Sequence, residues 1–225
     1  MRPTEGYARP GRRRRRAWAA DNRGNAADRR ELEGAIHAEI AREVGGSRPL
    51  LDCGCGTGWL LRSLADSGVA PDRLHGVDLD PARAEAARAR APGANVAVAD
   101  MTRLPYGNDL FGAVLFVVSL SSAGDRDAVR AALGEARRVL APGGMILCYE
   151  PRIPNPLNRS TVRVTTADLA AAGATPVDRR TLTLLPPLGR RLWRATPALH
   201  PLLSGIAPLR SHWLGVHRKP TAPAR

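Results

Sequence analysis

One glycine-rich stretch, residues 50–61, restricts the fold of this chain more than any other part of its sequence. It reads LLDCGCGTGWLL: a short apolar run with one acidic residue, then glycines at alternate positions, then an apolar helical pattern. Glycine is favoured where the backbone must adopt a positive φ or approach a ligand closely. The pattern therefore predicts a strand, a tight turn and a helix whose first N–H groups are free to bind a nucleotide-like cofactor.

Two known types of glycine turn compete as interpretations of this stretch. The dinucleotide fingerprint G-x-G-x-x-G/A needs a small residue at its third site, but Gly54 and Gly56 are followed there by the bulky Trp59. The sequence instead has Asp-x-Gly-x-Gly-x-Gly, with Asp52 just inside the strand. This pattern resembles the cofactor loop of the class I S-adenosylmethionine-dependent methyltransferases.

The next apolar segment, 73–78, ends in a second landmark of that family. Asp78 lies 24 residues after Gly54, where a carboxylate at the end of the second strand can accept hydrogen bonds from both ribose hydroxyls. The alternative role, the N-cap of the following helix, fits Asp80 better. We therefore expect Asp78 to bind ribose.

Later segments continue the resemblance in the same order. Asp100 and Met101 follow the segment 95–99 and resemble the family residues that contact adenine, although Asp100 could also form a simple turn at the strand end. The continuous apolar run 112–118 suits a parallel strand that is buried on both faces. Residues 137–144, RRVLAPGG, resemble the family's link into the fifth strand.

The resemblance implies an α/β fold: a doubly wound, mostly parallel seven-stranded sheet with helices on both faces. In this fold strand seven is antiparallel and lies between strands five and six. A helix over 28–44, with Asp28 as its N-cap, is predicted before the first strand. The other expected elements are strands at 49–53, 73–78, 95–99, 112–118, 145–150, 177–185 and 212–218, and helices at 59–67, 81–90, 128–140 and 165–172.

The length of 225 residues suits a single domain, which we place at residues 28–220. Residues 1–27 are expected to form a basic, partly disordered N-terminal segment, because prolines, glycines and five consecutive arginines precede the first helical pattern. Strand six ends and strand seven begins at the edge where the cofactor lies. Residues 186–210 are therefore expected to form a lid-like insert over the active face.

The resemblance also implies which residues contact the cofactor, S-adenosylmethionine. They lie in the glycine turn and at the ends of strands two, three and four. The expected cofactor-binding residues are Asp52, Gly54, Cys55, Gly56, Asp78, Leu79, Asp100, Met101, Phe116 and Val117.

Methyl transfer from a sulfonium is an in-line displacement, so the protein must mainly align the reactants and exclude water. A phenol or alcohol acceptor also needs a proton acceptor, for which histidine is well suited near neutral pH. His212, at the start of strand seven, is the first candidate. His200 in the expected lid is the second, and Glu150 at the end of strand five is the third, although Glu150 could simply bond to a loop.

The formal charge of +13 and the isoelectric point near 11.3 leave two interpretations open. Lys219 is the only lysine, and an arginine- and alanine-rich composition is typical of a coding bias. The alternative is an anionic partner, either a nucleic acid or a membrane surface. The three cysteines show no metal-ligand spacing, so no metal is expected. The absence of a signal peptide or a long apolar run predicts a cytoplasmic protein.

The sequence thus predicts a methyltransferase that acts on a small molecule, with O-methylation of a secondary metabolite or a glycan-type acceptor as the first hypothesis. The Asn-Pro-Pro-Tyr motif of several nucleic-acid and protein methyltransferases is absent after strand four. RNA methylation, or action at a membrane on a lipid-linked substrate through the segment Arg190 to Arg194, remain alternatives, as does cofactor binding without methylation. The protein is expected to be a monomer or a homodimer.

Overall fold

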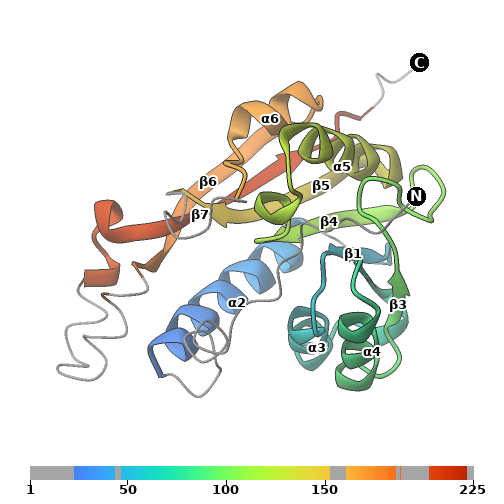
Figure 1. Ribbon diagram of the computed structural model, residues 1–225, viewed down its shortest axis with the longest axis horizontal. Coiled ribbons are helices and arrows are strands. Elements are labelled where there is room, and N and C mark those ends of the chain that lie inside the picture. Colours follow the sequence, from blue (N-terminus) through green and yellow to red (C-terminus); the bar gives the residue numbers. More distant parts are fainter. Residues whose placement is uncertain (1–22, 44–46, 153–160, 186–187, 189–202, 222–225) are drawn as a thin grey trace.

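Within the residues that the computed structural model describes, which are 23–43, 47–152, 161–185, 188 and 203–221, seven strands form one sheet (Figure 1). Their order is β3-β2-β1-β4-β5-β7-β6. The strands are β1 (Leu50–Cys53), β2 (Leu74–Asp78), β3 (Asn95–Val98), β4 (Phe111–Val117), β5 (Leu140–Pro151), β6 (Thr175–Leu184) and β7 (Arg210–Arg218).

Strands β1 to β5 run parallel to one another, and β7 is antiparallel to both of its neighbours, β5 and β6. Because β5 and β6 both oppose β7, they run in the same direction. This topology confirms the predicted α/β fold class, including the position of the antiparallel strand.

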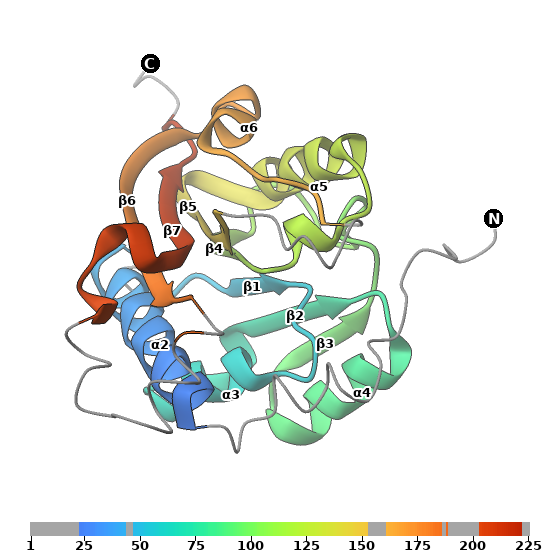
Figure 2. The same cartoon turned by 60° about the vertical axis from the view of Figure 1, so that its left-hand side comes forward.

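Helices cover both faces of the sheet (Figure 2). One face carries α2 (Arg23–Glu43), α3 (Trp59–Asp66) and α4 (Pro81–Arg90), and the other carries α5 (Arg126–Val139) and α6 (Thr166–Ala171). The short 3-10 segments are η1 (Pro71–Arg73), η2 (Leu120–Ser122) and η3 (Ala207–Leu209).

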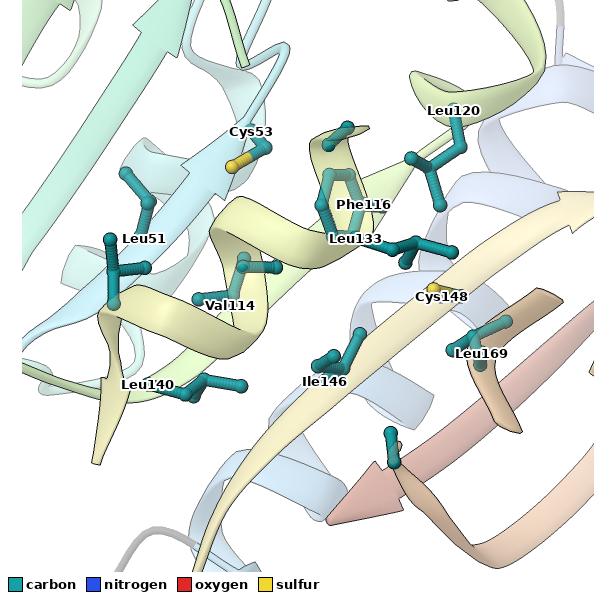
Figure 3. Packing of buried hydrophobic residues seen from close by; sticks show 14 of the residues in the cluster. Leu51, Cys53, Val114, Phe116, Leu120, Leu133, Leu140, Ile146, Cys148 and Leu169 are labelled. Carbon is teal, nitrogen blue, oxygen red and sulfur yellow. The ribbon is translucent and has the colours of Figure 1, made fainter. Parts of the chain in front are cut away.

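Each face of the sheet has its own hydrophobic cluster. On the α5 face, Val129, Leu133 and Ala136 recur at helical spacing and are buried, and the same cluster contains Val114 and Phe116 of β4 (Figure 3). On the opposite face, α2 buries one stripe of apolar residues against the sheet. This spacing is why the periodicity of the sequence located these helices correctly.

Two predicted boundaries were wrong. The first helix begins at Arg23 instead of residue 28, so Asp28 lies inside α2 and is not its N-cap. Ala26 and Ala27 have high helix propensity and extend the helix towards its N-terminus. The fifth strand begins at Leu140 instead of residue 145, because Leu140 pairs with Phe111 before an irregularity in the register.

The end of β7 explains the longer β5. Gly143 donates its N–H to the carbonyl of Lys219 at 3.0 Å, and Lys219 donates to the carbonyl of Gly144 at 2.9 Å. The Ala141 to Gly144 segment, which resembles a loop in the sequence, is thus held in the sheet by a strand about 75 residues later in the chain.

Parallel pairing brings the carboxyl ends of β1, β2, β3 and β4 to the same edge of the sheet. The residues that the sequence singled out at these ends therefore lie along one edge. Ligands of open parallel sheets bind outside this edge, so the fold places the candidate site there.

Lys219 gives a direct test of how β7 stabilises the fold. Its Nζ donates to Asp109 Oδ1 at 2.7 Å and to the carbonyls of Arg137 at 2.9 Å and Leu140 at 2.7 Å. Its side chain is only 19% exposed. We expect Lys219→Met to lower the free energy of unfolding by about 1–3 kcal/mol, because these acceptors lose their donor.

Denaturant unfolding measures this change. Arg62→Met is the matched control, because Arg62 pairs with Asp66 on an exposed helix surface, where an ion pair contributes little. Equal destabilisation by the two variants would contradict a special role for Lys219.

Candidate active site

The glycine turn adopts the backbone conformation that its sequence predicts. Gly54, Gly56 and Gly58 have φ of +77°, +55° and +74°. A Cβ atom on Gly54 would lie 2.6 Å from Ser119 Cβ, and one on Gly58 would lie 2.8 Å from Ala87 Cα. Both glycines are therefore required for close packing, whereas a Cβ on Gly56 would meet nothing within 4 Å, so Gly56 faces the open side of the turn.

Asp78 holds the turn in place. Its Oδ2 accepts the N–H of Gly56 and its Oδ1 accepts the N–H of Asp80, each at 2.9 Å. Each carboxylate oxygen has a further lone pair that can accept a ligand hydroxyl. Asp78 is thus suited to the predicted ribose contact while it also shapes the loop.

Two buried polar atoms beside Gly54 have no hydrogen-bond partner among the described residues. They are Oδ1 of Asp52 and Oγ of Ser119, on residues that are 3% and 8% exposed. Burial, and then the negative charge of Asp78, raise the pKa of Asp52 to about 7. A buried polar group without a partner costs about 1–3 kcal/mol, so this pair indicates a site for a ligand with hydrogen-bond donors.

Exposed apolar side chains line the same edge. Leu79, Val98 and Val118, at the ends of β2, β3 and β4, are 52%, 47% and 38% exposed. Val118 also has a φ of +56°, which is strained for a β-branched residue. Apolar side chains in such a position are typical of a surface that binds a flat organic group.

The other predicted cofactor residues differ in what they offer a ligand. Asp100 is exposed, and its Oδ1 accepts the N–H and the hydroxyl of Thr102, both at 2.8 Å, so the turn interpretation has direct support. Met101 and Val117 are half-buried. Cys55 and Phe116 are buried, so only their backbones are available to a ligand.

His212 lies at the carboxyl end of β5, where it pairs with Pro151. Its ring stacks on Tyr149 with 4.7 Å between the centroids, and its Nδ1 is 2.8 Å from Ser211 Oγ. Burial lowers the pKa of His212 to about 4. The imidazole is therefore neutral at physiological pH.

Glu150 points to the face of the sheet opposite to that of its neighbour Tyr149 and of His212. It is fully buried and accepts the N–H groups of Leu120 at 2.9 Å and Ser121 at 3.2 Å. Burial raises the pKa of Glu150 to about 7, although the bonds to Ser121 and Leu120 partly oppose this. The sequence left open whether Glu150 acts as a base or bonds to a loop, and these contacts support the bond to a loop.

The remaining predictions fall mainly outside the described residues. His200 lies there, and so does most of the expected lid, 186–187 and 189–202. Among the residues that are described, no group of three or more histidine, cysteine, aspartate or glutamate side chains could hold a metal ion. No helix in those ranges is long and apolar enough to cross a membrane.

Sequence reasoning missed the groups around His212. Tyr149, Thr183 and Glu31 meet there from β5, β6 and α2. None of them carries a motif or a special spacing. Only the structure shows that Thr183 has a φ of +64°.

Comparison with known proteins identifies the domain around this site. The family model described as a methyltransferase domain matches residues 51–148. A malonyl-[acyl-carrier protein] O-methyltransferase of Hahella chejuensis is 39% identical over 113 residues, which are 48% of this chain and 38% of that protein. The chain thus spans well under half the length of this curated relative.

Solved structures show the same fold. The amino pentose methyltransferase CalS10 from Micromonospora echinaspora, with S-adenosylmethionine bound, is 29% identical, has a TM-score of 0.50, and matches over 55% of this chain and 51% of that one. The [4+2]-cyclase SpnF has a TM-score of 0.62 at 21% identity, over 84% of this chain and 82% of that one. The cyclase illustrates that one fold serves different reactions.

The shifted pKa values predict a pH dependence of stability with two opposing contributions. The unfolded His212 gains a proton below about pH 6.5, but the folded one does so only near pH 4, so its contribution to stability is lost as the pH falls through this window. Asp52 keeps its proton in the folded state up to about pH 7, so its contribution is lost as the pH rises from about 4 to 7.

Unfolding free energies at pH 7.5 and pH 5 separate these effects. We expect His212→Gln to make the protein less sensitive to acid, and Asp52→Asn to make it more sensitive. A shift in the same direction for both variants would contradict the assignment.

Proposed function

By its domain at residues 51–148 the chain belongs to the class I S-adenosylmethionine-dependent methyltransferases, and on this premise we propose that it methylates an oxygen of a small molecule. The acceptor is a secondary metabolite or a glycan-type compound. The cofactor part of the proposal is carried by the unpartnered pair of Asp52 and Ser119 beside a glycine turn that Asp78 organises, and the choice of oxygen rests on the neutral His212 at the same sheet edge.

The described residues fit the cofactor group by group. Asp52 and Ser119 would accept hydrogen bonds from its ammonium group, and Asp78 would accept hydrogen bonds from its ribose hydroxyls. Leu79 and Val98 offer apolar surface to the adenine ring, and Asp100 offers a carboxylate oxygen to its amino group. When bound, the cofactor supplies a methyl group that is already activated on a sulfonium.

The protein's own tasks are then alignment, exclusion of water and removal of a proton. We assign proton removal to His212, because it lies at the active edge and is neutral at physiological pH. A phenol gives up its proton more readily than the hydroxyl group of a sugar, so phenols are the acceptors to test first within the proposed class.

The rival functions receive less support. Many arginines in the described ranges form ion pairs with acidic side chains, for example Arg126 with Asp168 and Arg180 with Glu39. The overall charge is therefore not by itself evidence of a phosphate-binding surface. RNA methylation and action on a lipid-linked substrate are retained as outcomes of the acceptor experiment below.

Titration calorimetry with S-adenosylmethionine and S-adenosylhomocysteine tests the cofactor site. We expect Asp78→Ala to weaken both ligands at least tenfold, about 1.4 kcal/mol, because the ribose acceptors and the anchor of Gly56 are lost. Asp80→Ala is the matched control, since Asp80 caps α4 through the N–H of Ala82. Binding of NAD, with none of S-adenosylmethionine, would overturn the cofactor assignment.

Methyl transfer from labelled cofactor to a panel of phenols, sugars, RNA and lipid vesicles tests the acceptor class. We expect transfer to phenols, and a kcat roughly 100-fold lower in His212→Gln with unchanged cofactor affinity. His37→Gln is the control, because His37 bonds to Ser63 between α2 and α3. Methylation of RNA with an affinity that falls steeply with salt, or activity only on vesicles, would contradict the small-molecule proposal.

A further inference from the structure

Ser211 connects His212 to the neighbouring strand β6. Its hydroxyl donates to the carbonyl of Thr183 at 3.2 Å and also lies 2.8 Å from Nδ1 of His212. Thr183 Oγ1 in turn bonds to the hydroxyl of Tyr149, on which the His212 ring is stacked. Four residues from β5, β6 and β7 thus form a closed ring of contacts, in which Thr183 takes part through both its side chain and its backbone carbonyl.

The single proton of the Ser211 hydroxyl determines the tautomer of His212. A carbonyl oxygen can only accept, so the bond to Thr183 uses that proton. The same hydroxyl must then accept in its contact with His212, and Nδ1 must carry the donated hydrogen. A neutral imidazole that is protonated on Nδ1 has its lone pair on Nε2.

The side chain and the N–H of Thr183 both make contacts that hold its carbonyl in place. The residue has a φ of +64°, which is unfavourable for a β-branched residue and costs about 1–3 kcal/mol unless the surroundings enforce it. Besides the contact with Tyr149, its N–H donates to Glu31 Oε2 at 3.1 Å. Glu31 also pairs with Arg210 at 3.3 Å, so α2 secures this conformation.

Resting on the proposed function, we propose that Ser211, supported by Thr183 and Glu31, is a positioning residue that keeps His212 protonated on Nδ1 and its Nε2 free to take the acceptor's proton. No described residue bonds to Nε2. This role does not depend on the expected cofactor-binding residues, because Ser211, Thr183 and Glu31 lie in β7, β6 and α2 and not among them.

The proton and electron balance of the step is complete with these groups. The bound cofactor would supply the methyl group to a lone pair of the acceptor oxygen, and its sulfur would keep the electron pair of the carbon–sulfur bond, so the protein has only the acceptor's proton to remove. The hydroxyl proton passes to Nε2, and the resulting imidazolium keeps its Nδ1–H bond to Ser211. Water then removes the proton from Nε2.

The ionisable groups around the ring come from three elements. Tyr149 of β5 stacks on it, and burial raises the pKa of that phenol. Asp28 and Glu31 of α2 and Glu150 of β5 also raise the pKa of that phenol, and Glu31 pairs with Arg210 of β7. Burial is the cause of the lowered pKa of His212 itself, so the tautomer of the neutral ring is argued from its hydrogen bond to Ser211.

Nitrogen-15 NMR of the histidine rings measures the tautomer directly and needs neither cofactor nor acceptor. The His212→Gln variant assigns the signal among the five histidines. We expect wild-type His212 to be protonated on Nδ1. Ser211→Ala should shift the ring towards the Nε2-protonated form, and Ser211→Thr should restore it. Ser67→Ala is the control, because that hydroxyl also donates to a backbone carbonyl, of Leu64, in a distant helix.

An Nε2-protonated wild-type ring, or a tautomer that is unchanged in Ser211→Ala, would overturn the proposal. With a methylated acceptor in hand, Ser211→Ala should lower kcat roughly tenfold, leave KM unchanged, and recover in Ser211→Thr. An unchanged kcat would also overturn it. If no acceptor is methylated the proposed function fails, and the NMR result still decides the tautomer separately.

Discussion

The site depends on how the glycine turn is attached to the end of β2. Gly54 and Cys55 both donate to the carbonyl of Val77, at 2.8 and 2.9 Å, and Gly56 donates to the Asp78 carboxylate. These bonds satisfy the N–H groups of a tight turn and fix its distance from the neighbouring strand. They also bring the carboxylates of β1 and β2 close enough for the charge of Asp78 to raise the pKa of Asp52. A cationic ligand at this place would offset the repulsion between the two carboxylates.

The antiparallel strand β7 creates the second half of the proposed active edge. Because it runs between β5 and β6, its first residues lie beside the last residues of β5, and His212 meets Tyr149 there. The N-terminal half of α2 reaches the same place through Glu31. The proposed acceptor side is thus assembled from α2, β5, β6 and β7, which are far apart in the sequence, whereas the proposed cofactor side is built from consecutive segments. Strain at Thr183 and Val118 lies at these strand ends, as is common near functional sites.

Much of the fold could be predicted because its signals are local. The glycine turn, Asp78 and the apolar strands each need only a few neighbouring residues to be recognised, and Asp80 forms the predicted cap of α4. One of the two boundary errors arose where distant segments intervene. Residues 141–144 resemble a loop by composition, but pairing with β4 and β7 draws residues 140–144 into β5. The other error, at Asp28, is local: the residues before Asp28 also favour a helix, so α2 begins at Arg23 and Asp28 is not its cap.

The sequence by itself determined the glycine turn, the order of the strands along the chain and the placing of acidic residues at their ends, because glycine conformation and hydrophobic periodicity are properties of short segments. Only the tertiary structure decided which polar groups meet at the acceptor side. Alternation along β5 places Tyr149 and Glu150 on opposite faces, but packing decides that Tyr149 faces His212 and Glu150 holds η2. The bond from Thr183 to Glu31 joins residues 152 positions apart. No local pattern encodes such a contact, because it exists only once helix and sheet are packed.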